Sequence, residues 1–174
     1  MQVDTFIDQA IAEIDGPTFL GDGGQVIYCG SFSKSIAPAL RVGYVIADEP
    51  VIRQLLALKT DAGTGSLEQL ALAEYCPSNF TEHVDRLMYT LRTKADAMVA
   101  AVRSEFGDNV QVTEPMGGIY VWLTFPAGTN TDALALAANQ AGIEFNPGSG
   151  WSSDHEWGKR RLRLCFGAPD LDTI

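Results

Sequence analysis

Residues 30 to 44 read GSFSKSIAPALRVGY, and this stretch is the most informative one about the fold of the chain. It places Lys34 among small and hydroxylated residues rather than on a charged helix face. Ser31 and Ser33 lie three and one residues before this lysine, and Arg41 lies seven residues after it. Hydroxyl donors and a guanidinium suit a phosphate dianion, because charge-assisted and bidentate hydrogen bonds are the strong ones. The cluster is therefore predicted to hold a phosphate beside an amine.

The position of Lys34 next to a fixed cation suggests what the amine does. A lysine close to Arg41 and partly removed from water has its charged form disfavoured, so we expect a neutral amine that can attack a carbonyl. A phosphate-bearing aldehyde matches this chemistry, and pyridoxal phosphate, an electron sink in carbanion reactions, is such a compound. The alternative is that the serines are turn residues and both cations are solvated. The cluster by itself favours this alternative, because short Ser/Lys/Gly clusters are common in loops.

Composition limits the possible partners. The 174 residues are 46% apolar and carry a formal net charge of -10, so a soluble protein with a sizeable core is expected. The negative charge argues against nucleic-acid and anionic-membrane surfaces. Three widely spaced cysteines without a CxxC pattern indicate neither a disulfide framework nor a metal site. We expect reduced, mostly buried thiols (Cys29, Cys76 and Cys165) and a cytoplasmic location, since no signal peptide or membrane span is visible.

The first half of the chain has the hydrophobic pattern of an α/β layer. QVIYCGSF (25–32) predicts a buried strand, RVGYVIAD (41–48) a second strand, and Pro50 starts a helix. SLEQLALAEYC (66–76) predicts a helix with Ser66 as its N-cap. We expect this helix to lie against the sheet through one face (Leu67, Leu70, Ala71 and Tyr75).

A long amphipathic helix is predicted over 79–106, where apolar residues recur at three- or four-residue spacing. VQVTEP and GGIYVWLTFP predict two strands joined by a turn at 116–118. TDALALAANQAG predicts a helix, IEFNPG a short strand, and RRLRLCFGA a final strand. We therefore expect three parts: a partial large-domain sheet with helices over 1–78, a connecting helix over 79–106, and a small α+β domain over 107–174.

The stretch GSFSKSIAPALRVGYVIAD closely resembles the cofactor-lysine segment of fold-type I pyridoxal-phosphate-dependent aminotransferases of class I/II. It is most similar to the aminoadipate-type enzymes and to aminotransferase-like domains fused to GntR-type regulators. The similarity continues in order through SLEQLALAEY, PMGGIYVWLTFP, NPGSGW and RLRLCF. By this resemblance Lys34 is the Schiff-base lysine, Ser31, Ser33 and Arg41 bind the cofactor phosphate, and Arg163 binds the substrate α-carboxylate.

The residues alone leave two candidates for that carboxylate. In RRLRLCF, Arg161 and Arg163 alternate with leucines, so both arginines share one face of a strand. Either side chain could bind a carboxylate bidentately, or be an ordinary surface charge. The spacing does not decide between them, and the family motif favours Arg163.

The resemblance covers the C-terminal half of such an enzyme. If VDTF (3–6) is aligned with the family's Asp-Asp-x-Tyr strand, Val3 replaces the aspartate that pairs with the cofactor ring nitrogen, and Phe6 replaces the tyrosine. Asp4 then matches the second aspartate, which is not the cofactor partner. Without a carboxylate at the ring nitrogen the electron sink weakens, so impaired cofactor binding and activity are expected of this chain alone.

Three functions follow as expectations. The first is an aminotransferase acting on an amino acid and a 2-oxo acid, as a homodimer or together with a missing half. The second is a catalytically silent domain that binds an effector or partner. The third is a lyase or decarboxylase on the same scaffold, because fold does not fix the reaction.

Overall fold

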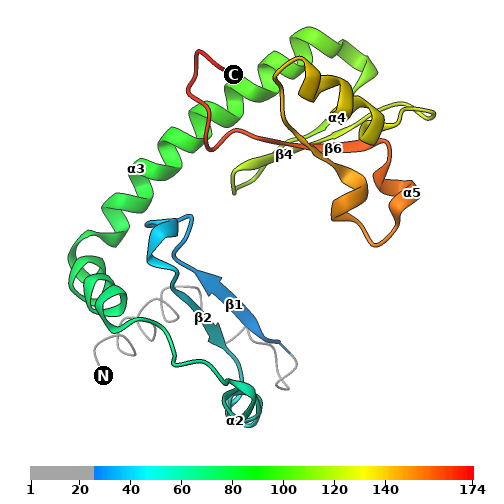
Figure 1. The fold of residues 1–174 in the computed structure, drawn as a ribbon. Helices are drawn as coiled ribbons and strands as arrows, with labels where there is room; N and C mark the ends of the chain where they lie inside the picture. The colour runs from blue at the N-terminus through cyan, green and yellow to red at the C-terminus, as the bar shows by residue number, and fades with distance from the viewer. Residues whose placement is uncertain (1–25) are drawn as a thin grey trace. The chain divides into compact units, whose positions relative to one another are not determined.

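The computed structural model describes residues 26–174, and the chain divides into two compact units, Met1–Leu87 and Met88–Ile174 (Figure 1). The predicted alignment of Val3, Asp4 and Phe6 lies outside the described residues. No helix within 26–174 has the length and apolarity that a membrane crossing requires.

The first unit contains an antiparallel hairpin in its described part. Strand β1 (Tyr28–Ser31) pairs with β2 (Gly43–Ile46), with Tyr28 opposite Ile46 and Ser31 opposite Gly43. The connection holds a 3-10 helix, η2 (Pro38–Leu40), and helix α2 (Glu49–Leu58) follows with its proline in the first turn, as predicted. Two predicted strands and the helix after them are thus confirmed.

The predicted burial in this unit is wrong in two places. Strand β1 alternates between half-buried and exposed residues, so it is not the fully buried strand expected from its sequence. The start of α3 (Ser66–Phe106) buries Leu72 and Cys76, whereas Leu67 and Leu70 are 77% and 63% exposed. The buried face of α3 packs in one cluster with residues that flank the strands (Phe32 and Val42). The contact therefore lies mainly at the end of the hairpin and includes only Tyr44 from the strands themselves.

Helix α3 is longer than predicted. It spans 41 residues and runs through Pro77, so the helix expected over 79–106 begins at Ser66. A proline removes one backbone donor from a helix interior. The Asn79 side-chain amide donates a hydrogen bond to the carbonyl of Tyr75 over 2.9 Å, which adds a polar contact around the proline. The first residues of the expected second segment thus continue the first helix.

The second unit contains a four-stranded antiparallel sheet of order β3-β4-β6-β5. Its strands are β3 (Gln111–Thr113), β4 (Tyr120–Thr124), β5 (Asn146–Pro147) and β6 (Arg161–Cys165). The other elements are α4 (Thr131–Gln140), α5 (His155–Gly158), and two 3-10 helices, η3 (Gly107–Asn109) and η4 (Gly148–Trp151). All four strands and α4 agree with the prediction, while no sequence pattern predicted the four-residue α5.

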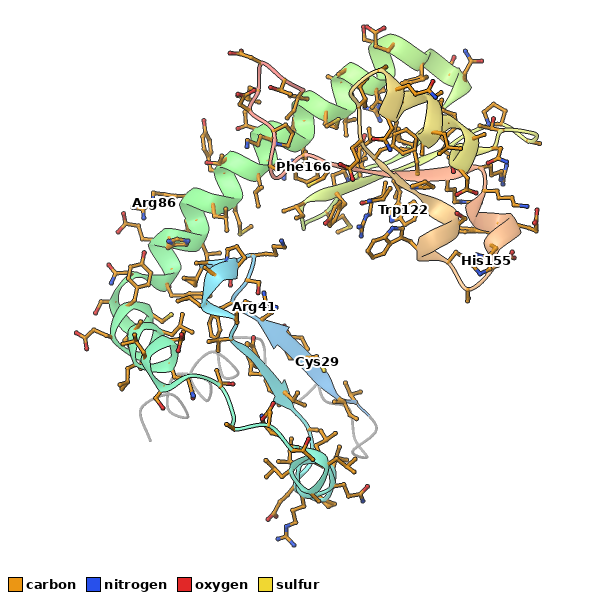
Figure 2. The ribbon with its side chains drawn as sticks, in the orientation of Figure 1. Cys29, Arg41, Arg86, Trp122, His155 and Phe166 are labelled. Atoms are coloured by element: carbon orange, nitrogen blue, oxygen red, sulfur yellow. The ribbon has the colours of Figure 1, made fainter. Side chains whose placement is uncertain are left out.

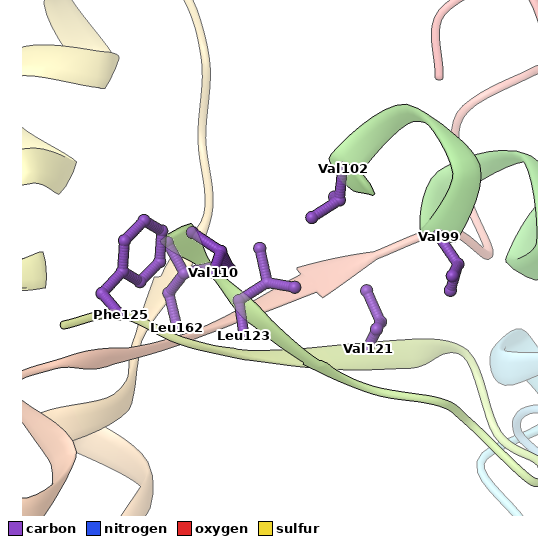
Figure 3. Packing of buried hydrophobic residues seen from close by; sticks show 7 residues of the cluster. All are labelled: Val99, Val102, Val110, Val121, Leu123, Phe125 and Leu162. Atoms are coloured by element: carbon purple, nitrogen blue, oxygen red, sulfur yellow. The ribbon is translucent and has the colours of Figure 1, made fainter. Parts of the chain in front are cut away.

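One face of this sheet packs on the C-terminal part of α3. The core cluster combines residues of α3, β4 and β6 with one residue before β3 and one after β4, as Figure 3 shows (Val99, Val102, Val110, Val121, Leu123, Phe125 and Leu162). Because side chains alternate along a strand, the residues between them on β4 and β6 lie on the opposite face. That opposite face carries Tyr120, Trp122, Arg161 and Arg163, which are half-buried. Trp122 is labelled in Figure 2. The fold is thus the expected mixture of a small sheet with helices and an α+β unit.

Candidate functional site

The end of the β1–β2 hairpin gathers the four residues predicted around a phosphate. Ser31 ends β1, and the backbone N–H of Phe32 donates to the carbonyl of Val42 over 3.1 Å. This bond places Ser33 and Arg41, the next residue on either side, at the same end of the hairpin (Figure 2 labels Arg41). Lys34 follows in the turn over 33–36. The structure thus brings Ser31, Ser33, Lys34 and Arg41 together.

The polar groups at this hairpin end leave several donors unengaged. The Oγ of Ser31 accepts from the backbone N–H of Ser33 over 3.1 Å, so its hydroxyl hydrogen remains free to donate. One Nη of Arg41 donates to the carbonyl of Pro38 over 3.2 Å. Among the ion pairs of residues 26–174, none involves Lys34 or Arg41. Two hydroxyls, a guanidinium and an amine without a competing carboxylate fit a phosphate group.

Arg41 adopts an unusual backbone conformation. Its φ of 53° and ψ of 32° lie in the left-handed region, and no other described residue except glycine has a positive φ. A left-handed conformation costs a non-glycine residue roughly 1–2 kcal/mol. Such strain is often found at functional positions, where the surrounding structure holds it in place. Arg41 directly follows η2, and its left-handed conformation redirects the chain into β2.

One expectation about Lys34 is wrong for the described residues. The sequence suggested a lysine partly removed from water, but Lys34 is exposed. The reason is that the apolar residues beside it, Phe32 and Ile36, turn toward α3 and leave the lysine on the open side of the loop. The aromatic side chains of the hairpin pack against one another, and Tyr44 contacts Phe32. Burial is the main cause that raises the pKa of Tyr44, and a hydrogen bond with Tyr28 raises it further.

Arg163 occupies a built environment on the sheet of the second unit. It lies on β6 opposite Trp122 of β4 and Asn146 of β5. Its guanidinium carbon lies 3.7 Å from the ring centroid of Tyr120 and 3.5 Å from that of Trp151. Its Nη2 donates to Asn146 Oδ1 over 3.0 Å. The side chain is therefore held by two rings and one amide.

The donors of Arg163 are not all used by the protein. A guanidinium has five N–H groups. One binds Asn146, and the Nε is buried without a hydrogen-bond partner among the described residues. A buried donor that lacks a partner is uncommon and calls for an explanation. The terminal N–H groups that Asn146 does not use suit a ligand that accepts hydrogen bonds, and a carboxylate matches their planar fork.

Arg161 differs from Arg163 in its contacts. Its guanidinium stacks on Trp157 at 3.4 Å, and its Nη1 donates to the backbone carbonyl of the same residue. Burial and the neighbouring charge of Arg160 lower the pKa of Arg161. Arg161 thus fastens α5 to the sheet.

The sequence did not indicate the residues around Arg163. Asn146, Tyr120 and Trp151 come from three different elements, and no spacing rule connects them. A signal existed in part, because Tyr120 alternates with buried residues on β4. The turn predicted at 116–118 contains Gly118, whose positive φ of 75° is typical of a glycine in a turn.

The cysteine prediction is correct in one respect and wrong in another. All three thiols are free, as expected, but Cys29 is exposed and Cys165 half-buried, leaving Cys76 as the buried one. The reason is that Cys29 lies on the outward-facing side of the narrow hairpin. Within residues 26–174 no group of His, Cys, Asp or Glu could hold a metal ion.

Comparison with known proteins identifies the family of this chain. The family model for class I and II aminotransferases matches residues 4–173, and the chain belongs to this family. The 2-aminoadipate transaminase of Thermus thermophilus is 33% identical over 151 residues, which cover 86% of this chain and 38% of that protein. The chain thus spans less than two-fifths of the length of this relative.

One further relative is a transcriptional regulator, and a similar solved structure is again an aminotransferase. The HTH-type transcriptional regulator NorG of Staphylococcus aureus is 33% identical over 155 residues, which cover 87% of this chain and 34% of that protein. Among solved structures, the α-aminoadipate aminotransferase of Thermus thermophilus, complexed with N-(5'-phosphopyridoxyl)-L-leucine, superposes with a TM-score of 0.80. It is 32% identical, and the match covers 86% of this chain and 39% of that one.

Proposed function

We propose that this chain is part of an aminotransferase that moves an amino group between an amino acid and a 2-oxo acid, with pyridoxal phosphate as its cofactor. The observation that carries the proposal is the gathering of Ser31, Ser33, Lys34 and Arg41 at one end of the hairpin. Membership in the family supports it, as does the phosphopyridoxyl ligand of the similar Thermus structure.

Each residue has a role that follows from its chemistry. Ser31, Ser33 and Arg41 would hold the cofactor phosphate through charge-assisted hydrogen bonds. The bound cofactor would supply an electron sink for the reacting carbon. The Lys34 amine would take the proton from the α-carbon of the amino acid and return one to that carbon in the reverse reaction, as general base and acid. Arg163 would bind the substrate α-carboxylate and orient the substrate.

An absorption titration tests the cofactor part of the proposal. Adding pyridoxal phosphate to the 174-residue chain should produce a new visible or near-ultraviolet band. After borohydride reduction, mass spectrometry should find the phosphopyridoxyl group on the peptide that carries Lys34. The variant Lys34→Ala should lack the adduct, and Lys59→Ala is the matched control because this exposed lysine pairs with Asp61 outside the hairpin end.

A second comparison isolates the phosphate site. Pyridoxal carries the same aldehyde without the phosphate, so the wild-type chain should prefer the phosphate form. Removing one charge-assisted hydrogen-bonding group costs about 1.5–3 kcal/mol, or roughly tenfold to a hundredfold in affinity. Arg41→Ala should therefore abolish most of the preference for pyridoxal phosphate without weakening the binding of pyridoxal. Equal binding of both aldehydes by the wild type would contradict the proposed phosphate site and would favour a cofactor-free, effector-binding domain.

We also infer that further protein covers the first unit, either a second copy in a homodimer or the part of an aminotransferase that this chain does not contain. Large apolar side chains in its described part are exposed, including three leucines of α2 (Leu55, Leu56 and Leu58). Helix α2 buries none of its residues, although one of its faces is apolar. An exposed apolar surface of this kind is typical of an interaction site.

A further inference from the structure

We propose that Asn146 is a positioning residue, which orients the guanidinium of Arg163 within its plane so that the terminal N–H groups face a carboxylate. This inference rests on the proposed function, because it concerns how the same arginine receives the substrate. Asn146 is not part of the motif that indicates Arg163, and its role comes from the hydrogen bond and the strand register alone.

The two aromatic rings fix the plane of the guanidinium but not its direction within that plane. Tyr120 and Trp151 stack at 3.7 and 3.5 Å from the guanidinium carbon. Turning within the plane keeps the guanidinium carbon over the ring centroids, so it changes the stacking little. A hydrogen bond in the plane supplies the missing restraint, because its energy depends strongly on direction. The bond from Nη2 to Asn146 Oδ1 is such a restraint.

The register of the sheet explains why Asn146 can make this bond. Asn146 lies directly opposite Arg163 in the β5–β6 pair, so both side chains leave the sheet on the same face. The next residue, Pro147, has a fixed φ and ends the two-residue strand. The loop after it carries Trp151 back over the guanidinium. One short segment thus supplies the in-plane amide and one of the two stacked rings.

The remaining donors indicate where a carboxylate binds. The Nε is buried, and one N–H of Nη2 is engaged by the amide. Three N–H groups remain: both on Nη1 and the second on Nη2. In the proposed arrangement the amide takes the Nη2 hydrogen on the Nε side, so that the other Nη2 hydrogen and one from Nη1 form a parallel pair that matches the two oxygens of a carboxylate. Asn146 therefore leaves the terminal fork free while it holds one side of it.

The charge state of the amide is essential to this role. Asn146 accepts the hydrogen bond as a neutral group, so the positive charge of Arg163 remains available for the ligand. A carboxylate at the same position would hold the guanidinium as well but would neutralise it. Two substitutions therefore separate the orientation of the Arg163 guanidinium from its charge. Asn146→Ala removes the restraint on orientation, and Asn146→Asp keeps that restraint but neutralises the positive charge.

Nuclear magnetic resonance of the full 174-residue chain, labelled with 15N, tests the inference. The Nε–H and Nη peaks of Arg163 are assigned by their loss in Arg163→Lys. Pyruvate serves as the probe because it is a 2-oxo acid with one carboxylate, and methyl pyruvate is the uncharged control. In the wild type the Arg163 peaks should be sharp and should shift saturably with pyruvate only.

The two variants should differ in a defined way. In the Asn146→Ala variant the Nη hydrogens of Arg163 should exchange faster. The variant should also bind pyruvate on the order of tenfold more weakly, which corresponds to the loss of one hydrogen bond to a charged group. Asn146→Asp should keep the slow Nη exchange and still lose the pyruvate response. Asn139→Ala, at an exposed position of α4, is the matched control and should behave as the wild type. Thermal unfolding confirms that each variant is folded.

The outcomes separate this inference from the proposed function. If Asn146→Ala keeps both the slow Nη exchange and the wild-type pyruvate affinity within about twofold, Asn146 does not position Arg163 and the inference is wrong. If the wild type shows no response to pyruvate, the proposed carboxylate site is wrong, and with it the purpose assigned to Asn146. The Nη exchange rates then still decide whether Asn146 orients the guanidinium.

Discussion

Replacing Gly148 by alanine tests how the loop that carries Trp151 is held against the sheet. Gly148 is buried at the start of η4. A Cβ at this position would lie 2.7 Å from the carbonyl oxygen of Gly158 and 2.8 Å from that of Arg161. Carbon atoms do not approach backbone oxygens this closely, and each of these oxygens can move only if the backbone that carries it moves as well. Gly148→Ala must therefore push the loop away from α5 and β6.

The size of the effect follows from the packing. Adding a methyl group to a well-packed interior costs about 1–3 kcal/mol, and contact with two backbone oxygens places Gly148→Ala near the upper end. For a chain of this length, about 2–3 kcal/mol corresponds to a decrease in Tm of roughly 5–10 °C. The loop displacement should also separate Trp151 from the guanidinium of Arg163. Urea unfolding monitored by tryptophan fluorescence measures the loss in the free energy of unfolding. Near-ultraviolet circular dichroism reports the displacement of Trp151.

Gly150→Ala is the matched control for this substitution. A Cβ on Gly150 meets no atom within 4 Å, and the residue is exposed in the same loop. Replacing such a glycine should leave the stability unchanged or raise it by about 0.4–1 kcal/mol through the unfolded state. Equal effects of Gly148→Ala and Gly150→Ala would refute the reasoning. A Cβ on Gly158 would meet Gly148 at 2.6 Å, so the double variant should lose less than the sum of the single losses.

Two more predictions concern the first unit. Burial raises the pKa of the Cys76 thiol above its ordinary 9.0, so the folded state holds this proton more tightly than the unfolded state. The free energy of unfolding should therefore fall as the pH rises above about 9, and Cys76→Ala should flatten this dependence in urea titrations. Replacing Leu56 and Leu58 by serine should lower self-association in light scattering, whereas the same change at Leu136, exposed on α4 in the second unit, should not. Unchanged association after the double serine substitution would exclude α2 as the contact surface.

The fold of the second unit was largely predictable because each of its main elements has a clear local signal. The alternation in YVWLT and in RLRLC matches strands with one buried face, and both lie where expected. The Asn130 side chain caps α4 by accepting from two backbone N–H groups, as Asn commonly does at this position. Periodicity is informative here because the sheet has one face buried on α3 and one face that is only half-buried.

The first unit shows where periodicity fails. Leu67, Leu70 and Tyr75 form a regular apolar stripe, yet the described structure buries Leu72 and Cys76 instead. Both sets have helical spacing, so the sequence of α3 allows either face to be the buried one. The choice depends on what the helix packs against. Here that is the Phe32 and Val42 pair, which comes together through the β1–β2 register and not through any local pattern.

The two arginines of β6 show what structure adds to a motif. Alternation places Arg161 and Arg163 on one face and leaves them equivalent. Their contacts separate them: Arg161 stacks on Trp157 and donates to its backbone, whereas Arg163 stacks on two rings and donates to a side-chain amide. A guanidinium that donates to the backbone helps to close a local turn, so its loss should affect mainly stability. A guanidinium held by rings and a neutral amide keeps both its charge and its terminal fork, which are the properties that carboxylate binding requires.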